Sequence, residues 1–177
     1  MNNPNHVFVQ LNQLFFISTF CTIAWMILMG SAIKPLNSRQ IVAFELARTP
    51  EGASKIIADW KSKDLILNAR KSIYLDFVFL VLYSGSIGIG CIVLSAFTRN
   101  SFLVQIGSVL SKVVPLAGIF DVVENLAMLK TLSGEIAALS VVIAYWFASI
   151  KFLIVLVALL FVFGCLIFGG VKQILNK

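Results

Sequence analysis

Four long apolar stretches constrain this chain more than any other feature of its sequence. A helix needs about 20 residues to cross the hydrocarbon core of a bilayer, and each stretch is at least that long. The sequence therefore predicts an all-α integral membrane four-helix bundle, with residues 1–177 forming a single membrane domain. The expected spans cover about residues 11–33, 73–97, 104–132 and 138–170.

The composition agrees with a membrane environment. Mean hydropathy is +0.96 and 12% of the residues are charged, whereas about 25% are charged in soluble proteins. A net charge of +6 does not indicate nucleic-acid binding, because the basic residues are neither gathered in one arm nor interleaved with aromatics. The three cysteines lie inside apolar runs without a CxxC pair, and His6 is the only histidine. We therefore expect no disulfide framework, zinc site or histidine-based triad, and the sequence identifies neither a cofactor nor a metal site.

The first apolar stretch is interpreted as a retained span and not as a cleaved signal peptide. No lysine or arginine precedes it in MNNPNHVFVQLNQ. The run Leu14–Ile33 is also longer than the apolar core of a signal peptide, which has about 7 to 15 residues.

The polar segment between the first two spans, residues 34–72, holds eight of the fourteen basic residues and four of the eight acidic ones. Thr49-Pro50-Glu51 predicts a helix start, with a hydroxyl cap, a proline at the first helical position and an acid in the first turn. We expect an amphipathic helical segment on the membrane surface or on the bundle, which can be a docking loop without activity of its own. The stripe residues are Ala53, Ile56, Ile57 and Trp60 in one helix and Ile41, Phe44, Glu45 and Arg48 in the stretch before it.

Small residues recur four apart in the second span, where Ser84 pairs with Gly88 and Ser86 with Gly90. Side chains of this size let another helix approach closely. The sequence thus predicts a packing face, used within the monomer or for dimerisation.

The limits of the last two spans leave alternatives open. Phe102–Lys112 is either an interfacial helix or the opening of the third span, whose continuous part, Val113–Leu132, has Pro115 near its start, where proline is tolerated. The fourth stretch exceeds one crossing, so it either tilts or begins late, near Val142. A late start brings Lys151 level with the acids of the other spans, and a start at residue 137 places it deeper.

Orientation follows from the lysines and arginines of short loops, which are retained on the cytoplasmic side. This rule places residues 34–72 and Lys130 inside. It places Arg99, Lys172 and Lys177 outside, so that both termini face away from the cytoplasm.

Polar side chains inside the spans are the candidates for function. Ionisable groups there cost about 2.5 to 3.5 kcal/mol each on insertion scales, so they usually face the bundle interior and have partners. Asp121 shares one side of its helix with Glu124 and Asn125, because three and four residues separate them. The predicted polar cluster contains Asp76, Asp121, Glu124, Asn125 and Lys151 in the cytoplasmic half of the bundle, with Tyr83 above it.

This cluster has two interpretations. It can be a buried network of ion pairs and hydrogen bonds that sets helix register, with Lys151 neutralising one carboxylate. Alternatively, its excess of acids over lysine requires a cation, a proton or a polar head group. Burial and like-charge repulsion then favour a protonated carboxyl, as in proton relays and general acids.

Three segments carry a resemblance: FELARTPEGASKIIADW, YLDFVFLVLYS and AGIFDVVENLAMLK. Together they resemble the pattern of small bacterial four-span membrane proteins that have no assigned activity, over most of residues 40 to 153. The resemblance implies the four-span architecture, and we expect the chain in the bacterial inner (plasma) membrane.

Two hypotheses for function follow. The first is a non-enzymatic carrier, accessory subunit or lipid- or cation-binding module. The second is a membrane-embedded lipid-modifying enzyme, in which Glu124 or Asp76 transfers protons and Lys151 or Asn125 stabilises negative charge. The expected partners are membrane lipids and, because the chain forms one small bundle without internal repeats, a second copy or a partner membrane subunit.

Overall fold

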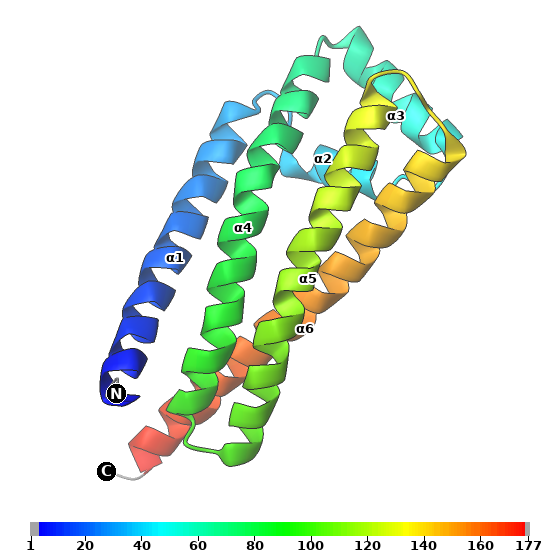
Figure 1. The fold of residues 1–177 in the computed structure, drawn as a ribbon. Helices are drawn as coiled ribbons and strands as arrows, with labels where there is room; N and C mark the ends of the chain where they lie inside the picture. The colour runs from blue at the N-terminus through cyan, green and yellow to red at the C-terminus, as the bar shows by residue number, and fades with distance from the viewer. Residues whose placement is uncertain (1–3, 176–177) are drawn as a thin grey trace. The chain divides into compact units, whose positions relative to one another are not determined.

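The protein is all-helical, as predicted, and has four helices long and apolar enough to cross a membrane (Figure 1). The structure is a computed structural model that describes residues 4–175, with side chains described from residue 8. These four helices support the assignment as a multi-pass membrane protein. The elements are α1 (Pro4–Ala32), α2 (Ser38–Glu45), α3 (Pro50–Ser62), α4 (Ile66–Phe97), α5 (Ser101–Leu132) and α6 (Ala138–Leu175).

The long helices extend beyond several of the predicted spans, because helical structure continues past the apolar stretch. Phe102–Lys112 is the opening of α5 and not a separate helix. Pro115 therefore lies inside α5, and its predicted place near a helix start is wrong. A proline is tolerated inside a membrane helix because neighbouring helices and local backbone adjustment satisfy the freed carbonyl. At the other open boundary, α6 begins early, at Ala138.

The chain divides into two compact units, and each of the four long helices contributes to both. The first unit takes its described residues from Met1–Thr22, Leu82–Ala117 and Phe152–Lys177, and the second consists of Ile23–Val81 and Gly118–Lys151.

In the first unit, small residues of α4 allow close helix contacts. The Ser86 hydroxyl lies 2.9 Å from that of Thr19 on α1. A Cβ at Gly90 would lie 2.8 Å from the Phe15 ring, and one at Gly88 would lie 3.4 Å from the Ser111 carbonyl oxygen. The predicted packing face is thus used within the monomer.

The second unit contains the amphipathic segment. In α2, the Asn37 side chain accepts from the Gln40 amide, and the Gln40 side chain accepts from the Asn37 amide, at 3.1 Å each. The predicted start of α3 is confirmed, since the Thr49 hydroxyl accepts from the Gly52 amide. Buried apolar residues of both helices then join one core with the ends of the long helices, beside which α2 and α3 lie (Figure 1). This core includes Ile41, Phe44, Ala53, Ile57, Trp60, Ile73, Met128, Leu132, Val141 and Ala144.

The orientation of the chain stays a prediction. In the second unit, Arg70 Nη2 lies 3.5 Å from the Leu132 carbonyl oxygen, so the polar segment and the α5 end that carries Lys130 lie together. In the first unit, Lys172 donates to the Thr98 carbonyl at 3.3 Å, next to Arg99. Lys177 lies outside the described residues.

Gly107 of α5 lies closer to the backbone of a neighbouring helix than the other described glycines do. A Cβ there would overlap the backbone carbonyl of Cys91 and the side chain of Ser95. We expect Gly107→Ala to destabilise the protein by about 1 to 3 kcal/mol, the usual cost of overpacking. Thermal unfolding in detergent measures this, with Gly85→Ala as the control, because a Cβ at Gly85 meets nothing within 4 Å. Equal melting temperatures for the two variants would contradict the contact.

Candidate functional site

The site is built around Lys151 of α6, which is 6% exposed in the second unit. Its Nζ atom donates to Asp121 Oδ1 at 2.5 Å and lies 2.8 Å from Glu124 Oε2. Both acids lie on α5 and are enclosed, with 2% and 0% of their surface exposed. One lysine thus links two buried acids of a neighbouring helix, where the geometry of each pair decides whether it is stabilising.

Asp76 of α4 joins the site through an amide. Asn125 Nδ2 donates to Asp76 Oδ2 at 2.8 Å. Asn125 is buried and Asp76 is half-buried, so Asp76 is the most accessible of the site's acids. Electrostatic interactions also connect Asp76 with Asp121 and Lys151.

A further acid, Glu45 of α2, was not among the predicted cluster residues. It is 9% exposed and interacts electrostatically with Lys151, Asp121 and Glu124. Burial raises the pKa of Glu45, Lys151 lowers it, and Asp121 raises it further. The available signal was the place of Glu45 in the apolar stripe with Ile41, where an acid faces the protein interior.

We call Glu45, Asp76, Asp121, Glu124, Asn125 and Lys151 the acid cluster. Its residues come from α2, α4, α5 and α6, and all lie in the second unit. Four carboxyl groups, one amide and one ammonium group are thereby brought together. If all were ionised, three negative charges would remain uncompensated within the cluster.

Three carboxyl oxygens of the acid cluster have no hydrogen-bond partner among the described residues. These oxygens are Glu45 Oε2, Glu124 Oε1 and Glu124 Oε2, and each is inaccessible to solvent. Glu124 Oε2 is nevertheless in ion-pair range of Lys151, although the angles are not those of a hydrogen bond. Glu124 Oε1 and Glu45 Oε2 thus receive no hydrogen bond from the described residues, and this arrangement is costly for an ionised carboxylate.

Tyr83, the remaining predicted residue, is buried in α4 but belongs to the first unit. Its position above the cluster therefore stays a prediction.

Lys151 contacts Asp121 although α6 begins early, at Ala138. At 1.5 Å per residue, Asp121 lies about 17 Å from the last residue of α5, and Lys151 lies about 20 Å from the first residue of α6. The two depths are comparable, and the long lysine side chain reaches Glu124 as well.

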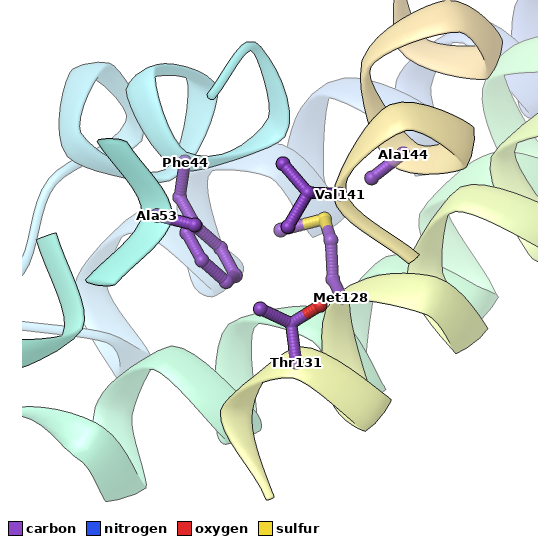
Figure 2. A pocket seen from close by; sticks show the side chains of 6 residues that line it. All are labelled: Phe44, Ala53, Met128, Thr131, Val141 and Ala144. Carbon is purple, nitrogen blue, oxygen red and sulfur yellow. The ribbon is translucent and has the colours of Figure 1, made fainter. Parts of the chain in front are cut away.

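A small pocket lies along the same helices. It has a volume of about 10 Å³, close to the space that one water molecule needs. Figure 2 shows Phe44 and Ala53 of the amphipathic segment facing the ends of the long helices across it. Met128 lines it one turn along α5 from Glu124. The lining residues are Phe44, Ala53, Met128, Thr131, Val141 and Ala144.

Comparisons with known proteins assign no chemistry to this arrangement. No family model, curated protein or solved structure matches the chain. Among the described residues, no group of three or more histidine, cysteine or acidic side chains is arranged to hold a metal ion.

Removing the ammonium group of the acid cluster should be costly. In Lys151→Met, Asp121 keeps a buried charge without its cation, and such a loss costs about 3 to 5 kcal/mol at neutral pH. Thermal unfolding in detergent at neutral pH measures this loss.

Two variants control for this prediction. Lys130→Met removes the exposed pair with Glu135 and should change stability by no more than about 1 kcal/mol. Adding Asp121→Asn to Lys151→Met should restore part of the lost stability. A Lys151→Met protein as stable as Lys130→Met would show that the buried pair contributes nothing.

Proposed function

We propose that this protein is a non-enzymatic membrane module that binds protons at the acid cluster. The observation that carries the proposal is Glu124, which is fully buried and has one carboxylate oxygen without any partner among the described residues. A buried carboxylate of this kind pays a desolvation cost of several kcal/mol. Binding a proton removes that charge, so Glu124 is the acid to which we assign the bound proton.

The charge balance of the acid cluster supports the same proposal. Lys151 compensates one carboxylate, and Asp121, at 2.5 Å, is its closest partner. The remaining three acids are then neutral when each holds a proton. Like charges so close together in a medium of low dielectric repel strongly, which favours proton uptake over full ionisation.

The packing favours a proton over a larger ligand. Asp121, Glu124 and Lys151 are closely enclosed, and the pocket beside α5 takes about one water molecule. A proton needs no additional volume, whereas a lipid head group would need the helices to separate. The same enclosure makes binding a better account of the cluster than acid–base catalysis on a lipid, because a lipid substrate must reach the carboxyl groups.

A proton-binding site fits two of the roles open to a small membrane bundle: a carrier and an accessory subunit. A bundle of this size without internal repeats would need a second copy or a partner subunit to form a complete transport path. The resemblance to small bacterial four-span proteins supports placement in the bacterial inner membrane.

Infrared spectroscopy tests the proposal, because protonated carboxylic acids absorb apart from carboxylates and shift in D2O. At neutral pH the wild-type protein in lipid should show a protonated-carboxyl band. The band should lose intensity in Glu124→Gln and be unchanged in Glu135→Gln, which alters an exposed glutamate. Raising the pH should reduce the wild-type band, since the proton is then released.

Two results would contradict the proposal. One is a wild-type spectrum at neutral pH without a protonated-carboxyl band. The other is a band of equal intensity in Glu124→Gln, which would mean that Glu124 carries no proton.

A further inference from the structure

Glu45 is the one acid of the cluster that does not lie on a long apolar helix. Asp76, Asp121 and Glu124 lie on helices that cross the membrane, whereas Glu45 lies on α2, an eight-residue helix in the polar segment between two spans. Its side chain is nevertheless 9% exposed and one of its oxygens, Oε2, has no partner among the described residues. An acid of the buried site is thus supplied by a segment outside the membrane.

The contacts of residues 37–63, here called the α2–α3 segment, are of two kinds. Within the segment the packing is close, with the rings of Phe44 and Trp60 5.1 Å apart in an edge-to-face arrangement. Between the segment and the long helices, the shared apolar core contains the small pocket of Figure 2, which has Phe44 and Ala53 on one side and α5 and α6 on the other. The Arg48 guanidinium lies 5.7 Å from the centre of the Tyr145 ring, which is a weak cation–π contact because Arg48 is exposed.

Burial opposes the ionisation of Glu45 while the segment is packed, and it is the main reason why the pKa of Glu45 is raised from its ordinary value of 4.5. Lys151 of α6 attracts the ionised form, and Asp121 of α5 repels it. Glu124 of α5 and Asp76 of α4 repel it only when they are themselves ionised. The packed state therefore binds this proton more tightly than the open state. Packing is favoured at low pH and weakens as the pH rises through the raised pKa.

We propose that Glu45 controls the access of water to the acid cluster. With its proton bound, Glu45 stays in the cluster and the α2–α3 segment stays packed on α5 and α6. When Glu45 gives its proton to water, the carboxylate that forms is costly to keep buried, because Oε2 has no donor among the described residues and Asp121 repels the charge. The segment then separates along the pocket, water reaches the cluster, and the proton of Glu124 exchanges. This inference rests on the proposed function and adds its regulation.

The fluorescence of Trp60 tests the inference, because this side chain is 1% exposed in the packed segment. Trp25→Phe and Trp146→Phe leave Trp60 as the only tryptophan, and acrylamide quenches it when water reaches it. Quenching should rise several-fold as the pH increases from mildly acidic to alkaline. It should stay low throughout in Glu45→Gln, which cannot ionise.

Glu51→Gln is the matched control, since Glu51 is an exposed glutamate on the same segment. It should follow the wild type. Quenching independent of pH in the wild type, or an equal rise in Glu45→Gln, would overturn the inference. The wild-type titration decides the matter even if Glu45→Gln fails to fold.

The two proposals fail separately. A protonated-carboxyl band together with constant Trp60 quenching would refute control by Glu45 and leave proton binding intact. Absence of the band, with quenching that still depends on Glu45, would refute proton binding instead. If both hold, the exchange of the cluster protons for deuterium should be several-fold slower in Glu45→Gln than in Glu51→Gln.

Discussion

The ion pair of Lys151 with Asp121 is the interaction on which the second unit depends. Lys151 is contributed by α6 and Asp121 by α5, so the two charges connect these helices inside the protein. Each charge costs several kcal/mol to remove from water, and each compensates another only while the helices keep their register. Asp76 adds a carboxyl group from α4 and Glu45 adds one from α2, so the net charge of the cluster depends on four helices of the second unit.

Sequence patterns predicted the parts of this structure that depend on local chemistry. Apolar length predicted the four spans, and Thr49-Pro50-Glu51 predicted the start of α3 because capping involves neighbouring residues. Helical spacing indicated that Asp121 and Glu124 share a side. Their contacts with Lys151, and that of Asp76 with Asn125, are present in the structure, whereas their use as a site is a proposal.

Other features depended on contacts that a sequence does not contain. Glu45 was placed on the stripe of a surface helix, but its burial among the acids results from the packing of α2 on the long helices. The close contact at Gly107 depends on where α5 crosses α4. The interior position of Pro115 depends on how far α5 extends towards its N-terminus, and polar residues within Phe102–Lys112 hid that continuity.

The central claim is that the excess acids are retained for binding and reduce stability. Thermal unfolding of Asp76→Asn and Glu124→Gln beside the wild type tests it most directly, because both changes replace an ionisable carboxyl with a neutral amide of the same shape. The account predicts that stability is maintained or rises in both variants, since the amide is neutral without binding a proton and Glu124 Oε1 loses no partner. A sharp loss of stability in both would contradict it and would show that the acid cluster is a structural network.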